Sequence, residues 1–67
     1  MLLKEYLDTQ NITQAKFGSL IGVSHVIVHR LVHRKITPSL KLAAKIKRTT
    51  QGQVSFEDLI RNENENP

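Results

Sequence analysis

The segment from Thr13 to Leu31 constrains the fold of this chain more than any other. Its pattern predicts two short amphipathic helices that are joined by one tight turn. Thr13 is a suitable N-cap for a helix over residues 14–21, and Gly22 can adopt the left-handed backbone that ends such a helix. Ser24 can cap a second helix that extends to about residue 33 or 34. Gly18 and Gly22 are small enough for the two helices to approach closely.

Three further helices are predicted around this pair, so we expect an all-α fold of five short helices. The first helix ends around residues 8–11 and is indicated by apolar residues at helical spacing, namely Leu2, Leu3, Tyr6 and Leu7. A fourth helix is expected to begin with Thr37 as its cap and Pro38 as its first residue, and to run to about Arg48. Residues 49–53 are expected to form a loop. Ser55 then opens a short last helix with the pattern of a capping box.

Apolar periodicity also predicts which residues form the core. In the second and third helices these are Phe17, Leu20, Ile21, Ile27, Val28, Leu31 and Val32. The apolar residues of the fourth helix fall on two sides. This helix is therefore expected either to contact several neighbours or to keep one face for a partner.

The length of 67 residues predicts one small domain, which we place at residues 1–61, followed by a disordered polar tail at residues 62–67. The sequence has no cysteine, so neither a disulfide framework nor a thiolate metal site is expected. No apolar run approaches the ~20 residues that cross a membrane, and nothing resembles a signal peptide. We expect a cytoplasmic protein that does not associate with membranes.

The charge distribution favours a polyanionic partner. The formal net charge is +4, and all six carboxylate side chains lie outside the segment from Thr9 to Phe56. That segment carries eight basic residues, which are Lys16, Arg30, Arg34, Lys35, Lys41, Lys45, Lys47 and Arg48. Basic residues neutralise phosphates, whereas carboxylates would be repelled by them. The alternative is a solvated basic face without a partner.

The predicted third helix presents basic and imidazole side chains on the arc opposite its apolar residues. A helix of this kind can enter the major groove of DNA, as the second helix of a helix-turn-helix motif does. Arg30 can bind guanine through two hydrogen bonds, and Val26 can contact a thymine methyl group. Gln14 and Lys35 are placed to reach phosphates. The full set of expected DNA-contacting residues is Gln14, Ser24, His25, Val26, His29, Arg30, His33 and Lys35.

The sequence offers weaker support for metal binding and for catalysis. His25, His29 and His33 share one helix face, and histidines four residues apart can bind zinc. The first and last of them are ~12 Å apart along the helix axis, however, and no cysteine or nearby acidic residue completes a site. The serines lack a recognisable general base, and there is no glycine-rich phosphate loop. We therefore expect no metal, no cofactor and no enzymatic activity.

From Ile12 to about Leu59, the sequence resembles the Cro/repressor-type (XRE-like) helix-turn-helix family of phage and bacterial regulators. The resemblance is carried by three groups of residues. The first group is Ile12-Thr13-Gln14, Phe17-Gly18, Ile21-Gly22-Val23-Ser24, Val28 and Leu31. The second is Pro38-Ser39-Leu40, and the third is Val54-Ser55-Phe56-Glu57-Asp58-Leu59.

The resemblance implies a lambda-repressor-like domain of five helices that regulates transcription, usually as a dimer on a two-fold operator. It implies base contacts from His25, Val26, His29 and Arg30, and a phosphate contact from Gln14. The chain departs from the family at Arg34, where many members have glycine, and at Val32, near which many members have an acidic residue.

These observations together predict a Cro-like repressor, of a phage or prophage type, that occupies double-stranded operator DNA through residues 24–34. No small-molecule effector is expected. A homodimer on DNA is expected, with a contact surface that includes Ile46, Val54, Phe56 and Ile60. The alternative is a DNA-binding antitoxin or adaptor that binds a protein partner and autoregulates its operon. A third possibility is a protein that coats nucleic acid without sequence preference.

Overall fold

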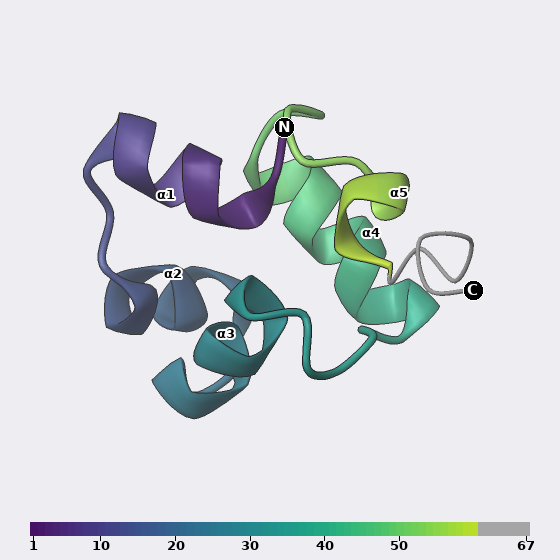
Figure 1. The fold of residues 1–67 in the computed structure, drawn as a ribbon, viewed down its shortest axis with the longest axis horizontal. Helices are drawn as coiled ribbons and strands as arrows, with labels where there is room; N and C mark the ends of the chain where they lie inside the picture. The colour runs from purple at the N-terminus through teal and green to yellow at the C-terminus, as the bar shows by residue number, and fades with distance from the viewer. Residues whose placement is uncertain (61–67) are drawn as a thin grey trace.

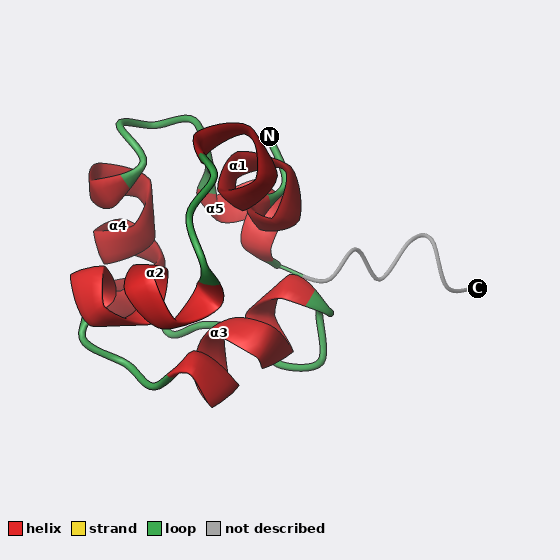
Figure 2. Ribbon diagram, turned by 90° about the vertical axis from the view of Figure 1, so that its left-hand side faces the viewer, coloured by secondary structure: helices red, strands yellow, loops and turns green. Residues whose placement is uncertain are grey.

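The computed structural model describes residues 1–60, which form five helices and no strand (Figures 1 and 2). The helices are α1 (Leu3–Gln10), α2 (Gln14–Ile21), α3 (His25–Val32), α4 (Leu40–Thr49) and α5 (Phe56–Leu59). The predicted all-α architecture of five short helices is thus confirmed for this part of the chain. The predicted polar tail lies outside the described residues. None of the five helices is both long and apolar enough to cross a lipid bilayer.

The beginnings and ends of α2 and α3 follow local signals in the sequence. The Lys16 N–H donates to Thr13 Oγ1 at 3.0 Å, so Thr13 caps α2 as predicted. Gly22 ends this helix in the left-handed conformation, with φ at 78°. Ser24 caps α3 by accepting a hydrogen bond from the Ile27 N–H at 3.4 Å. These three predictions are confirmed.

The prediction for the start of α4 is wrong by two residues. Ser39, not Thr37, is the N-cap, and its Oγ accepts a hydrogen bond from the Leu42 N–H at 3.2 Å. Pro38 precedes the cap and is buried rather than forming the first turn. A proline disfavours helical backbone in the residue before it, and the serine that follows offers an equally good cap. Thr37 to Ser39 therefore remain non-helical.

One hydrophobic core joins all five helices. Its buried residues are Leu3, Tyr6, Leu7, Phe17, Ile21, Val28, Leu31, Ala43, Ile46, Val54 and Leu59. Ile27 and Val32 pack against this core and are half-buried, which agrees with the predicted apolar arc of α3. Leu20 was expected in the core but is 47% exposed, and Leu2 is also exposed. Helical periodicity places Leu20 beside the buried residues of α2, yet no neighbouring element within residues 1–60 covers it.

The predicted dimer surface is also partly wrong. Ile46 and Val54 have no exposed surface, so they belong to the core and cannot contact a second copy. Phe56 is exposed and Ile60 is half-buried. The apolar residues of α4 do divide as predicted, because Ile46 faces the core while Leu40 is 76% exposed.

Helix α3 ends in a Schellman motif that has an arginine where glycine is preferred. The Arg34 N–H donates to the Leu31 carbonyl at 3.1 Å, and the Lys35 N–H donates to the Arg30 carbonyl at 2.8 Å. Arg34 adopts a left-handed φ of 57°. Its guanidinium also donates to the carbonyl of Ile60 at 3.0 Å, so the side chain connects the end of α3 to the residue that follows α5.

We predict that Arg34→Gly will be more stable than Arg34→Ala by about 1 kcal/mol, because glycine adopts a left-handed backbone without a Cβ penalty. Both variants lose the guanidinium hydrogen bond, so Arg34→Ala should be less stable than the original protein, whereas in Arg34→Gly the relieved backbone offsets about 1 kcal/mol of that loss. Urea denaturation followed by circular dichroism measures these differences. Gln51 occupies the same position after α4, also with φ at 57°, and provides the matched pair Gln51→Gly and Gln51→Ala. Equal stability of the glycine and alanine variants at both sites would contradict the prediction.

The short helix α5 is fixed by a capping box in which the Asp58 carboxylate is the main acceptor. Its Oδ2 accepts hydrogen bonds from the Met1 ammonium group at 2.8 Å, from the Ser55 N–H at 3.0 Å and from Ser55 Oγ at 3.0 Å. The predicted capping box is confirmed. The Met1 hydrogen bond, followed by the Ser55 backbone hydrogen bond, holds the pKa of Asp58 below its usual value of 3.8.

This lowered pKa predicts how Asp58 contributes to stability at different pH values. The carboxylate of the unfolded chain binds protons more readily than that of the folded protein. The contribution of Asp58 to the free energy of unfolding is therefore present above about pH 4, and it is lost as the pH falls through the lowered pKa of the folded state. We expect Asp58→Ala to lower the free energy of unfolding by about 1 kcal/mol at neutral pH, which is typical for the loss of a cap. Urea denaturation at pH 7 and at about pH 3 should show the difference between the two proteins shrinking in acid. A difference that is independent of pH would contradict this account.

Candidate nucleic-acid interface

Helix α3 is positioned by a very close approach between α2 and the turn that follows it. A Cβ atom placed on Gly18 would lie 2.6 Å from the Val23 carbonyl oxygen and 3.3 Å from the Ser24 carbonyl atoms. Only glycine allows this contact. The Val23 N–H in turn donates to the Gly18 carbonyl at 2.9 Å. Gly18 therefore fixes the point at which α3 starts.

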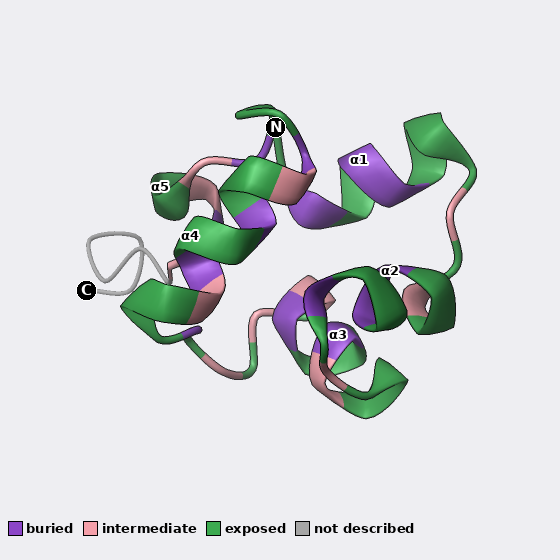
Figure 3. Ribbon diagram, turned by 180° about the vertical axis from the view of Figure 1, so that it is seen from behind, coloured by how far each residue is buried: buried purple, intermediate pink, exposed green. Residues whose placement is uncertain are grey.

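The buried residues of α3 determine which of its side chains face outward. Val28 and Leu31 are fixed in the core, so the residues on the opposite side of the helix face solvent. We call this set the α3 outer face, and it consists of His25, Val26, His29 and Arg30, all of which are exposed. Val26 is 43% exposed, although an isolated exposed valine is not unusual. Figure 3 shows exposed residues along the outer side of α3, which lies at the lower edge of the molecule in all three ribbon views.

No carboxylate within the described residues neutralises the cations around this face. The two ion pairs in residues 1–60 join the Met1 ammonium group to Asp58 and Lys4 to Asp8. Neither pair involves a basic residue of the acid-free segment between residues 9 and 56. Arg30 and Lys35 are both exposed, so each can bring its full charge to a partner. The face is consequently suited to an anion.

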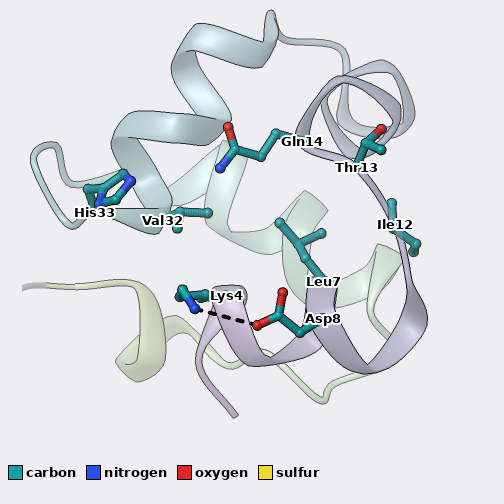
Figure 4. Close-up of a pocket in the computed structure, with 8 residues that line it drawn as sticks. All are labelled: Lys4, Leu7, Asp8, Ile12, Thr13, Gln14, Val32 and His33. Carbon is teal, nitrogen blue, oxygen red and sulfur yellow. Dashed lines mark ion pairs between the residues drawn. The ribbon is translucent and has the colours of Figure 1, made fainter.

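Two of the predicted site residues line a shallow pocket between the start of α2 and the end of α3. Gln14 is the first residue of α2 and is half-buried, while His33 caps the end of α3 and is exposed. Both line a pocket of about 260 Å³, together with Lys4, Leu7, Asp8, Ile12, Thr13 and Val32 (Figure 4). The start of α2 and the end of α3 therefore form one continuous part of the surface, as a partner that lies along α3 requires.

The two remaining predicted residues flank α3. Ser24 precedes the α3 outer face and is exposed, but its Oγ already accepts the capping hydrogen bond. Its hydroxyl hydrogen is still able to donate to a phosphate. Lys35 follows the end of α3 and is exposed. The structure thus places all eight predicted site residues on or beside α2 and α3, with Gln14 and His33 at one end and Ser24 and His25 at the other.

Lys45 lies near the turn between α2 and α3, which the sequence did not predict. The Lys45 ammonium nitrogen lies 3.5 Å from the position that a Cβ on Gly22 would occupy. Lys45 comes from α4, yet it lies over the turn between α2 and α3. Its charge is favourably placed at the carboxyl end of α2. The two positions are separated by more than twenty residues, so no local pattern could have related them.

The arrangement can bind and position an anionic partner. In residues 1–60 there is no group of three histidine or carboxylate side chains that could hold a metal ion. Asp58, whose pKa is lowered, is in the capping box of α5 and not on α3. Comparison with known proteins gave no match to a protein family, to a curated protein or to a solved structure.

Proposed function

We propose that this protein is a sequence-specific double-stranded DNA-binding regulator that uses α2, the turn at Gly22 and α3 as a helix-turn-helix. The proposal is carried by one observation, which is the exposure of His25, Val26, His29 and Arg30 on the side of α3 that faces away from the core. The arginine and the imidazoles supply hydrogen-bond donors, and the valine supplies an apolar contact. These are the groups that distinguish base pairs in the major groove.

The flanking residues supply the contacts that hold the duplex in register. The first backbone N–H groups of α2, near Gln14, favour a phosphate because the amino end of a helix carries partial positive charge. Lys35 can contact a phosphate beyond the other end of α3. Such contacts add affinity without sequence information, whereas the α3 outer face supplies the specificity.

We propose that the biological role is repression, with the protein occupying operator DNA and blocking polymerase, as in a Cro-like regulator. A single eight-residue helix contacts few base pairs, so useful affinity requires two copies on half-sites about one helical turn apart. Leu40 or Phe56 is available for contact between copies, because both are exposed.

The proposal can be tested by selecting bound duplexes from a random pool and then footprinting the protein on the most enriched sequence. We expect one enriched, two-fold symmetric sequence that is retained against about a thousand-fold excess of unrelated duplex. A protein that coats DNA without preference would enrich no sequence and would be displaced equally by any duplex. Failure to bind duplex DNA at low salt would reject the function altogether.

A second candidate, an antitoxin or adaptor, is favoured by the exposed apolar residues of α2 and α4. Leu20 and Leu40 are exposed, and a groove of about 300 Å³ is lined by Ile21, Val23, Leu42 and three polar residues. An adaptor would form a stable complex with the product of a neighbouring reading frame. Its affinity for that product would fall in Leu40→Asp, while DNA binding by the α3 outer face would be retained.

A further inference from the structure

The imidazole rings of His29 and His33 lie in contact at the end of α3. Their ring centroids are 4.3 Å apart and their planes are inclined by 55°. The His33 N–H donates to the His29 carbonyl at 3.0 Å, so a full α-helical turn holds the two residues one above the other. Both side chains are exposed. Neither is part of an ion pair within residues 1–60.

We infer that His29 and His33 form a two-ligand site for a borderline divalent transition-metal ion, such as Ni²⁺ or Zn²⁺. Neutral imidazole nitrogen is a preferred ligand of these ions. Histidines four residues apart on a helix hold zinc in other metal sites, because one helical turn brings their nitrogens to the same ion. Here the rings are already together, so binding requires only small side-chain rotations and no change in the backbone.

The rest of the coordination shell comes from water. The described residues contain no third histidine or carboxylate that completes a cluster with this pair. The site is therefore open and binds less tightly than a structural zinc site with four protein ligands. Asp8 and Gln14 line the same pocket as His33, but the Asp8 carboxylate pairs with Lys4 at 3.5 Å (Figure 4).

His25 makes the inference specific. It is also four residues from His29, so spacing alone allows a site on either turn of α3. Among residues 1–60, however, the only histidine pair with rings in contact is His29 with His33. His25 is the first residue of α3, where the helix begins after its cap, whereas His33 closes the last turn. The structure thus assigns the ion to the carboxyl end of the helix.

Titration of the full chain with Ni²⁺, in the absence of DNA, tests this site. In NMR spectra, paramagnetic broadening should be greatest for the imidazole signals of His29 and His33. The thermal unfolding midpoint should rise with Ni²⁺ concentration, because the ion binds the paired imidazoles of the folded helix more tightly than the separate ones of the unfolded chain. Addition of EDTA should reverse both effects, because the chelator removes the ion from the site.

Three matched variants decide where the ion binds. His29→Gln and His33→Gln should each weaken Ni²⁺ binding by at least about 10-fold, the lower limit for disturbing even an outer-shell partner. His25→Gln should leave the affinity unchanged. All three positions are exposed, and circular dichroism verifies that each variant is folded. The assignment would be overturned if His25→Gln abolished Ni²⁺ binding while His33→Gln retained it. It would also be overturned if all three substitutions had the same small effect on Ni²⁺ affinity, or if the original protein did not bind Ni²⁺. None of these results depends on DNA, so the metal site and the DNA-binding proposal can fail separately.

Discussion

Replacing Gly18 with alanine is expected to destabilise the protein by about 2 kcal/mol. The new methyl group would lie 2.6 Å from the Val23 carbonyl oxygen, a separation that Cβ atoms essentially never show. This neighbour is backbone, so the contact cannot be relieved by rotating a side chain. Overpacking of this kind costs ~1–3 kcal/mol, and we expect the upper end of the range here. The better helix propensity of alanine offsets only ~1 kcal/mol of it.

Urea denaturation of Gly18→Ala measures this effect, with Ser19→Ala as the matched control. Ser19 is the next residue of α2 and is exposed, so its replacement improves helix propensity without creating a close contact. We expect Ser19→Ala to be stabilising by about 0.5 kcal/mol. If Gly18→Ala proved as stable as the original protein, α2 and the turn at Val23 could not be in contact as described.

The same substitution should weaken DNA binding under conditions in which the variant is folded. The displaced backbone leads directly into Ser24, which caps α3 and fixes the direction of that helix. A small rotation of α3 would move Arg30 and the other side chains of its outer face away from the base edges. Ser19→Ala should retain full affinity.

Local signals made α2 and α3 predictable from the sequence. Thr13 and Ser24 each precede an amphipathic segment, and Gly22 stands where a left-handed residue is needed, so each boundary has its cause within a few residues. The start of α4 was predicted wrongly, because Ser39 caps the helix in place of Thr37 and leaves Pro38 buried before the first turn.

Contacts between distant segments could not be predicted in this way. The burial of Ile46 and Val54 depends on how α4 and the segment before α5 meet the other helices. The hydrogen bond from Arg34 to Ile60 connects positions 26 residues apart. Helical periodicity placed His29 and His33 on one face, but whether their rings touch depends on side-chain rotamers. Local patterns therefore predicted which side of α3 faces solvent better than they predicted contacts between distant segments.

Arg30→Ala is the decisive test of the DNA-binding proposal, and we expect it to cost about 1–3 kcal/mol in binding to the preferred duplex. Arg30 is exposed on the α3 outer face, and within residues 1–60 no carboxylate pairs with its guanidinium. A side chain in this position can bind guanine through two hydrogen bonds. Its loss should therefore abolish the preference for guanine at one base pair of each half-site.

Lys35→Ala separates this effect from simple loss of charge. Both substitutions remove one positive charge from an exposed position, so both should reduce the salt dependence of binding if both side chains contact the DNA. Only Arg30→Ala should change the order in which operator variants are preferred, because the loss of a phosphate contact in Lys35→Ala would weaken binding to all sequences alike. Competition binding over the single-base variants of one half-site measures that order. If Arg30→Ala weakens every duplex equally, Arg30 is a backbone contact, and sequence recognition must come from the remaining residues of the α3 outer face, His25, Val26 and His29.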